Sequence, residues 1–299
     1  MSDGFLNLHK PAGWTSHDCV AKLRRLLKTK KIGHAGTLDP AATGVLPVAV
    51  GRATRLLQYL PGDKAYRAVI QLGTTTDTDD LDGTVLTQTS TAHITQADVT
   101  EQLSHFQGII QQIPPMYSAI HVNGQRLYDL ARQGETVDVP SRQVTVHSID
   151  LVNWQAGEVA QITLNIACGA GTYIRSIARD LGQRLGVGGT LATLIRTQSS
   201  GFTLDTSITF ETLAEQPNTV ELIAPAVAME HLPNIVLATD AGRRWCLGQR
   251  LPIEPTITLE QPIRVATETF ALLGIGLFMM KDNQPYLVPK MVWASPTLE

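Results

Sequence analysis

Apolar side chains that alternate with polar ones recur in short runs along this chain and predict β-strands. The clearest runs cover residues 65–72, 144–152 and 162–168. Because strand side chains point alternately to opposite faces, each run is expected to bury one face of a sheet. An earlier apolar run, residues 5–8, leads into a Lys-Pro-x-Gly turn. It predicts a strand that ends in this turn, shortly before a helix begins.

Two other segments carry hydrophobic positions at helical spacing and predict amphipathic helices, residues 17–27 and 172–185. Ser16 is expected to cap the first helix, since a serine hydroxyl can accept the free backbone N–H groups there. Gly186 is expected to end the second, because glycine tolerates the left-handed conformation of a C-terminal cap. The apolar stripe of the second helix is formed by Ile174, Ile177, Ala178, Leu181 and Leu185.

The order of these elements predicts a fold class and two domains. Strand-like and helical runs alternate over residues 1–230, which favours an α+β domain with a mixed, mainly antiparallel sheet. Residues 231–299 look like a small β-rich unit, with strands expected at 263–266, 270–276 and 286–289. A chain of 299 residues, 43% of them hydrophobic, is long and apolar enough for both.

Charge is distributed unevenly. The chain has 24 lysines and arginines against 27 aspartates and glutamates, a net charge of −3. Cations are nevertheless concentrated in one stretch, at Lys22, Arg24, Arg25, Lys28, Lys30 and Lys31. Such a cluster can bind the phosphates of a nucleic acid whatever the total charge, although a solvated helix face is its common alternative.

Several other features narrow the class of protein. An acidic run, Asp77, Asp79, Asp80 and Asp82, lacks the distal glutamate of a calcium loop and is interpreted as a solvated turn between strands. Three distant cysteines, Cys19, Cys168 and Cys246, indicate neither a zinc site nor a catalytic thiol. The sequence has no apolar run of about 18 residues and no signal-peptide pattern, so we expect a cytoplasmic protein with no membrane partner.

The segment 33–44, GHAGTLDPAATG, carries the strongest candidate for catalysis. Its one acidic residue, Asp39, lies among glycines and directly before Pro40, which biases it toward an extended backbone. Placed just after the basic stretch, it suggests a carboxylate held on a tight loop beside a polyanion. From these residues alone, an ordinary turn is the favoured interpretation.

At this point the chain resembles a known family, the pseudouridine synthases, and within it the bacterial TruB type that acts on uridine 55 of tRNA. The resemblance rests on segments in the expected order across nearly the whole chain: 10–16, 33–55, 64–68, 112–119, 171–175, 273–276 and 288–290. One departure is His121, at a position where the family usually has lysine. It removes a positive charge that could contact a phosphate.

The resemblance implies a pseudouridine-synthase fold, a PUA-like C-terminal domain and an isomerase that needs no metal or other cofactor. It assigns Asp39 as the nucleophile or charge stabiliser, Tyr66 to stack on the uracil and assist loss of the C5 proton, and Arg175 to orient Asp39. From pattern alone, a core strand residue is the favoured interpretation of Tyr66. For Arg175, a surface arginine on an amphipathic helix is an equal alternative.

The resemblance also implies a binding site for a base flipped out of the tRNA T-loop. It places His34 in the vacated position, and Tyr173 and Leu194 at the pocket wall, with Lys10 and Arg55 also contacting the substrate. Outside the resemblance, a lone histidine is more often structural. Residues 113–142, with Arg126, Arg132 and Arg142, correspond to a flexible thumb that closes on the RNA.

The expected partner is tRNA, bound by a monomer at its T-arm and elbow and, through residues 231–299, at its acceptor stem. Two other functions stay open. One is a tRNA-binding folding chaperone for which catalysis is secondary. The other is a guided synthase acting on ribosomal RNA, which the lack of long basic tails disfavours.

Overall fold

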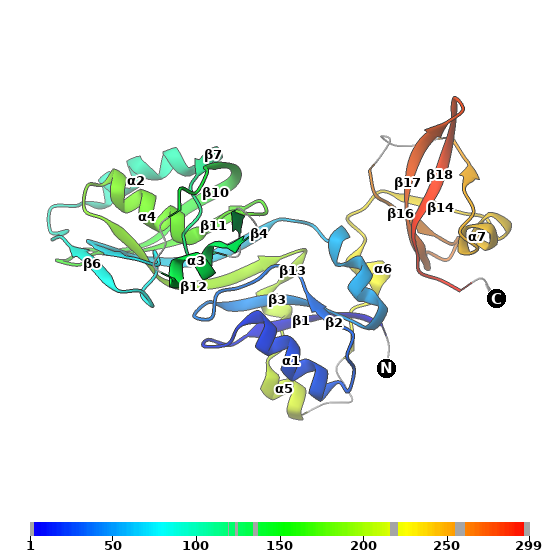
Figure 1. Cartoon of the computed structure of the whole chain (residues 1–299), viewed down its shortest axis with the longest axis horizontal. Helices are drawn as coiled ribbons and strands as arrows, with labels where there is room; N and C mark the ends of the chain where they lie inside the picture. The colour runs from blue at the N-terminus through cyan, green and yellow to red at the C-terminus, as the bar shows by residue number, and fades with distance from the viewer. Residues whose placement is uncertain are drawn as a thin grey trace.

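A computed structural model describes residues 3–118, 120–122, 125–133, 137–215, 221–254 and 261–295 of the chain. Its strands form two main sheets, the first built from residues of the N-terminal two thirds and the second from residues 234–292. Figure 1 shows the second sheet set apart from the first, beside α6 (Pro225–Ala228).

The first sheet has nine strands, in the order β1-β3-β12-β4-β11-β10-β7, with β2 on β3 and β13 on β12. Their bounds are β1 Gly4–Lys10, β2 Ile32–His34, β3 Thr43–Val50, β4 Lys64–Leu72, β7 Gly108–Gln112, β10 Arg142–Gln155, β11 Gln161–Cys168, β12 Gly189–Ser199 and β13 Phe202–Thr203. Only the β12–β3 pair is parallel. The prediction of a mixed, mainly antiparallel sheet is therefore confirmed.

The expected strands form where the alternating pattern placed them. In β4, Tyr66, Ala68, Ile70 and Leu72 are buried, while Arg67 between them is exposed. These side chains join those of β11 in the largest hydrophobic core, which α4 (Ile174–Arg184) also covers. The stripe predicted for this helix is buried, and Gly186 follows it with a φ of 74°.

The first helix shows a small correction. It is α1 (Ser16–Leu26), and its cap is Thr15, not Ser16. Thr15 accepts from the Asp18 backbone N–H, and the Asp18 carboxylate accepts from the Thr15 N–H at 3.0 Å, which completes a capping box. Ser16 instead bonds to the backbone of Leu38, whose N–H donates to its hydroxyl at 2.9 Å. The serine therefore ties α1 to the loop that carries Asp39.

The remaining elements connect or cover these strands. The helical ones are η1 (Gly51–Tyr59), α2 (Gln96–Leu103), η2 (Ser104–Phe106), α3 (Leu127–Arg132), η3 (Leu204–Thr206) and α5 (Phe210–Glu215). Two hairpins pair β5 (Thr74–Thr76) with β6 (Val85–Gln88), and β8 (His121–Val122) with β9 (Gln125–Arg126). In the parts of the chain that the structure describes, no helix is long and apolar enough to cross a membrane.

The second sheet confirms a β-rich C-terminal unit, in the order β14-β16-β17-β18-β15. Its elements are β14 Asn234–Val236, α7 Thr239–Cys246, β15 Leu251–Pro252, β16 Ile263–Ala266, β17 Leu272–Lys281 and β18 Gln284–Val292. Strand β17 begins two residues later than predicted, because Phe270 lies in a turn with a φ of 62°. Ile275 and Met291 pack with Phe5, Ala53 and Leu56 of the first unit.

Candidate active site

Asp39 lies on the loop between β2 and β3, and its side chain is 43% exposed. The loop is fixed at several points around it. Leu38 is buried and bonded to Ser16, and the Ala35 N–H donates to the Pro47 carbonyl at 2.9 Å. Gly44 has a φ of 101°, and a side chain there would collide with the backbone of Arg196. Asp39 is therefore an accessible carboxylate on a rigid loop.

Arg175, near the start of α4, holds this carboxylate. Its side chain is only 6% exposed, and its Nε lies 3.0 Å from Asp39 Oδ2 and 3.7 Å from Asp80 Oδ2. Its terminal nitrogens donate to the carbonyls of Thr78, at 3.1 Å, and Tyr117, at 2.9 Å. A buried guanidinium with this many acceptors has a fixed orientation, so Arg175 is not a surface arginine.

A hollow of about 360 Å³ opens beside these two carboxylates. Its lining combines Asp39, Asp80 and Asp82 with apolar side chains, among them Leu81, Leu191 and Leu194. A concave site with an apolar wall and a few polar groups is typical of small-ligand or base binding. Leu194, expected at a pocket wall, thus lines the hollow that contains Asp39.

Tyr66 lies on β4, which pairs with the strand that carries Leu194, and is only 7% exposed. It pairs across the sheet with Arg196, and its hydroxyl interacts with the guanidinium of that residue. Burial raises the pKa of Tyr66 to about 12. The phenol is therefore neutral at physiological pH and cannot act as a pre-formed base.

Arg196 is fully buried and was not expected from the sequence. Its Nε donates to the Val45 carbonyl at 2.7 Å, and its Nη2 donates to the Gly36 carbonyl at 3.0 Å. Burial lowers the pKa of this guanidinium. Through these bonds Arg196 joins the Asp39 loop to the strand that carries Tyr66.

His34 ends β2 and stacks edge-on against His17, with ring centroids 5.4 Å apart. Its Nδ1 is buried and has no hydrogen-bond partner among the described residues. Burial, and next the nearby His17, lower the pKa of His34. The imidazole is therefore neutral at physiological pH, as a group that fills space next to bases would be.

Tyr173 directly precedes α4. Its backbone N–H donates to the side-chain oxygen of Gln112 at 2.8 Å, and its carbonyl accepts from the side-chain nitrogen of Gln112 at 3.0 Å. The guanidinium of Arg142 lies over its ring, 4.8 Å from the centroid. Tyr173 is half-buried at the base of segment 113–142. The side chains of His121, Arg126 and Arg132 in that segment lie outside the described residues.

Neither Lys10 nor Arg55 forms an ion pair with the Asp39 carboxylate among the described residues. Lys10 is fully buried, and its Nζ donates to the carbonyls of Pro11, Trp14 and Pro40. Burial lowers the pKa of this ammonium group. Arg55 is exposed on η1, with its Nη1 3.5 Å from the Val292 carbonyl of the C-terminal unit.

The acidic run is a correction to the sequence-based interpretation. It does connect two strands, β5 and β6, but two of its members are mostly buried and form ion pairs with α4: Asp80 with Arg175, and Asp79 with Arg179. Burial raises the pKa of both carboxyls. The sequence did contain a signal for these ion pairs. Arg175 and Arg179 are four residues apart on one predicted helix, so they present two cations on one face.

Comparison with known proteins gives a consistent result. A family model described as TruB family pseudouridylate synthase (N terminal domain) matches residues 24–174, and one described as tRNA pseudouridylate synthase B C-terminal domain matches residues 175–240. A curated tRNA pseudouridine synthase B from Gloeothece citriformis is 54% identical, covering 97% of this chain and 96% of its own length. One from Synechocystis sp. is 49% identical, covering 97% and 99%.

Two solved structures share the fold and confirm the predicted fold class. A crystal structure of a Cbf5-Nop10-Gar1 complex gives a TM-score of 0.76 at 27% identity, covering 98% of this chain and 85% of that one. A structure of an H/ACA RNP bound to a substrate RNA containing 2'-deoxyuridine gives 0.75 at 26% identity, covering 98% and 86%. With more than half of its length matched by the N-terminal family model, the chain belongs to the TruB family of pseudouridylate synthases.

Proposed function

We propose that this protein isomerises the T-loop uridine at position 55 of tRNA to pseudouridine. Its curated relatives are named tRNA pseudouridine synthase B. The observation that carries the proposal is the Asp39–Arg175 pair, 3.0 Å apart, at the edge of a hollow with apolar walls. An oriented carboxylate beside a base-sized pocket is what this reaction requires.

The reaction breaks the bond between ribose C1′ and uracil N1 and forms one between C1′ and C5. The C5 proton is lost and N1 gains a proton, so the overall change is an isomerisation. The Asp39 carboxylate acts directly, as the nucleophile or as the charge that stabilises the detached sugar. Arg175 orients it, and Tyr66 supports the base through its ring.

The target uridine must leave the T-loop before it reaches Asp39. Flipping a base costs a few kcal/mol, and a side chain that occupies the vacated position lowers that cost. We assign this role to His34, and the walls of the base pocket to Leu194 and Tyr173. Lys10 we assign to positioning: its three acceptors are carbonyls of residues 11, 14 and 40, on both sides of the site.

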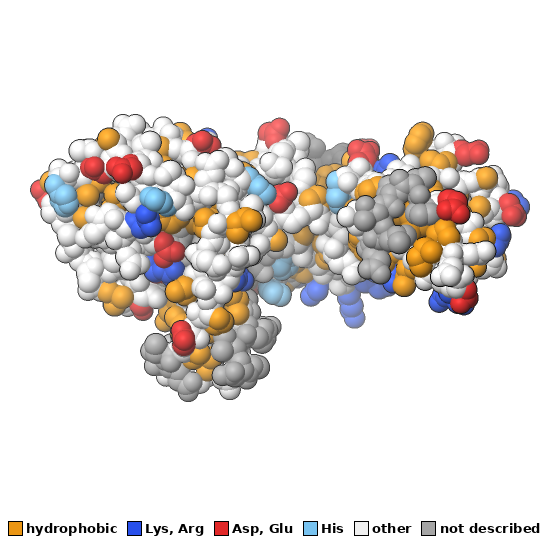
Figure 2. Space-filling view, turned by 90° about the horizontal axis from the view of Figure 1, so that it is seen from above, with side chains coloured by type: hydrophobic (Ala, Val, Ile, Leu, Met, Phe, Trp, Pro, Cys, Tyr) orange, Lys and Arg blue, Asp and Glu red, His pale blue; other side chains and the backbone are white. Residues whose placement is uncertain are grey.

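Phosphates of the tRNA would bind the exposed cations. Lys30 and Lys31 after α1 and Arg55 on η1 are exposed, and Figure 2 shows lysine and arginine side chains gathered along one edge of the molecule, between its two units. Clusters of this kind supply sequence-independent affinity for RNA.

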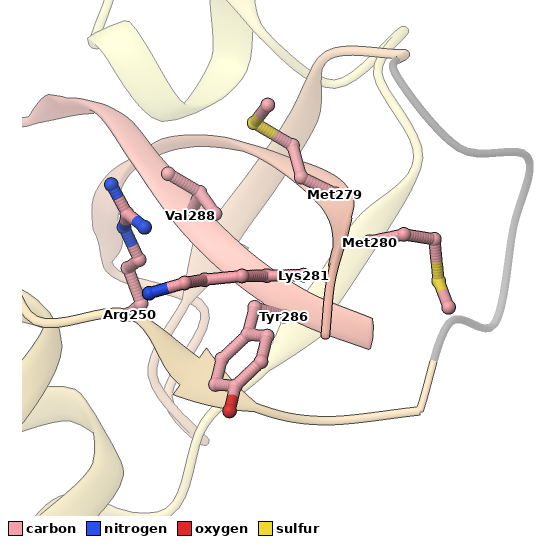
Figure 3. A pocket seen from close by; sticks show the side chains of 6 residues that line it. All are labelled: Arg250, Met279, Met280, Lys281, Tyr286 and Val288. Atoms are coloured by element: carbon pink, nitrogen blue, oxygen red, sulfur yellow. The ribbon is translucent and has the colours of Figure 1, made fainter. Parts of the chain in front are cut away.

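The C-terminal unit, residues 231–299 in the proposed domain division, would contact the acceptor stem as a PUA-like domain. It has a cavity of about 130 Å³ on the β17–β18 hairpin. Figure 3 shows Arg250 and Lys281 extending to the same side of this cavity, with the Tyr286 ring beside Lys281. Two cations next to an aromatic ring can hold a phosphate and an adjacent base.

The activity is tested with an unmodified tRNA transcript that carries tritium at uracil C5. Tritium release to water is expected with this transcript and absent when cytidine replaces uridine 55. No release from either RNA, with binding intact, would contradict the proposed activity and favour a folding chaperone. Release that required a guide RNA and a ribosomal fragment would favour the guided reaction.

A further inference from the structure

The acidic loop between β5 and β6, residues 77–83, is fastened to α4 by a second ion pair outside the pocket. Asp79 Oδ2 lies 2.9 Å from Arg179 Nη1, and the two side chains are 14% and 28% exposed. Neither residue lines the hollow that contains Asp39. The pair therefore lies outside the hollow in which the base is proposed to bind.

The two ion pairs join the same two elements, the acidic loop and α4. Asp79 and Asp80 are consecutive in the loop, and their partners Arg179 and Arg175 are one helical turn apart on α4. The loop is also bonded to β12: the Asp79 carbonyl accepts from the Leu191 N–H at 3.0 Å, and the Leu81 N–H donates to the Leu191 carbonyl at 3.1 Å. A shift of the loop at Asp79 would necessarily move the Asp80 carboxylate away from Arg175.

The backbone at Asp79 needs such support. Its φ is 62°, in the left-handed region that residues other than glycine adopt rarely, although aspartate adopts it more readily than most. A conformation of this kind persists where neighbouring contacts enforce it. Here the ion pair to Arg179 and the bond to Leu191 do so.

Arg179 also reaches the start of segment 113–142. Its Nη2 donates to the Ile113 carbonyl at 2.8 Å, and the Ser176 hydroxyl donates to the same carbonyl at 2.8 Å. Arg175 donates to Tyr117 a few residues further on. One guanidinium therefore joins the acidic loop, α4 and the base of the expected thumb.

We propose that Asp79 and Arg179 are positioning residues, which fix the Asp80 carboxylate against Arg175 and so fix the orientation of Asp39. They act through Asp80 and do not touch the RNA. The inference rests on the proposed isomerase activity, since it assigns these residues to the chemical step of that reaction.

The test compares single-turnover tritium release and tRNA affinity in the full-length protein. Asp79→Asn removes the loop's charge with little change in shape, and is expected to lower the rate constant about tenfold, with Kd changed less than about twofold. Arg179→Lys keeps a cation but loses the forked geometry, so it is expected to retain more of the rate.

Asp180 supplies a matched control. It lies 2.8 Å from Arg179 Nε, but it belongs to the same helix and forms no ion pair with the described residues of the loop. Asp180→Asn therefore removes a carboxylate from the same guanidinium and is expected to leave the rate constant within about twofold of wild type. Equal losses in Asp79→Asn and Asp180→Asn would overturn the proposal.

A double-mutant cycle with Asp80→Asn separates positioning from general support of the fold. If Asp79 acts through Asp80, then Asp79→Asn causes no further loss of rate in the Asp80→Asn background. Fully additive losses would contradict the proposal. If Asp79→Asn does not fold, the same cycle is run with Arg179→Lys. An inactive wild-type protein would contradict the proposed function itself. An active wild-type protein with additive losses in the cycle would contradict only the positioning role.

Discussion

At the scale of residues, the site is organised by three buried cations with different tasks. Arg175 pairs with carboxylates, whereas Lys10 and Arg196 donate to backbone carbonyls that flank the Asp39 loop. A buried charge without a carboxylate partner is costly unless each of its hydrogen bonds is well made, so these groups fix the loop firmly. The carboxylate is then oriented before substrate arrives.

The role of Lys10 can be separated from RNA binding. Lys10→Met leaves three carbonyls without their donor and is expected to lower the free energy of unfolding by about 1–3 kcal/mol. Because Lys10 has no exposed surface, the dependence of tRNA affinity on salt is expected to stay unchanged. Chemical denaturation and binding titrations at several salt concentrations check both. A salt slope reduced by about 0.7–0.9 would instead assign Lys10 to a phosphate contact.

His34 gives the protein a specific pH dependence. Its pKa is lowered in the folded state, chiefly by burial, so the unfolded chain binds more protons at that position. Stability is then expected to fall as pH drops below about 6.5, the ordinary histidine value. His34→Gln should reduce the loss of Tm between pH 7 and pH 5. The control His93→Gln, at an exposed position, should keep the wild-type loss; equal behaviour of both variants would refute the assignment.

At the scale of elements, the sequence predicted what depends on periodicity and missed what depends on contacts between distant segments. The strands β4, β10 and β11 and the helix α4 followed from alternating or helical patterns. The packing of Asp80 against α4 could not be predicted in this way, because an Asp-rich run has the same sequence whether it faces water or an arginine. The resemblance supplied Asp39 and Arg175, but no local pattern indicated Arg196, which looks like any strand residue until its three acceptors are known.

The helix α1 and the turn after it are expected to bind phosphates. Replacing exposed Lys30 and Lys31 by glutamine should weaken tRNA binding and lower the slope of log Kd against log salt by about 0.7–0.9 for each lost contact. Arg184→Gln at the far end of α4, where the side chain bonds to Gln102, is the control that removes one cation away from this stretch. An unchanged slope in the double variant would indicate that this stretch is a solvated surface that does not bind phosphates.

At the scale of the whole molecule, the C-terminal unit is joined to the first by a packed interface. Arg52 donates to the Trp293 carbonyl and lies 4.8 Å from the centre of the Trp293 ring, beside the shared core of Phe5, Leu56 and Ile275. The interface gives the acceptor stem a defined position relative to the T-arm, if both units bind one tRNA as proposed.

That arrangement predicts a difference between RNAs. Arg250→Gln combined with Lys281→Gln is expected to raise KM severalfold for full-length tRNA and to leave KM unchanged for an isolated T-arm stem–loop, because the stem–loop cannot reach the cavity in Figure 3. Steady-state kinetics with the two RNAs provide the comparison. Equal increases for both would place these residues outside any acceptor-stem contact.

The central claim is that Asp39 performs the isomerisation, and the most direct measurement is tritium release by Asp39→Asn under single-turnover conditions. Asparagine preserves shape but removes the negative charge that the reaction uses, so release is expected to fall below detection. Kd for tRNA is expected to stay within about threefold of wild type, because binding uses the basic surface. Retention of most of the wild-type rate would contradict the account.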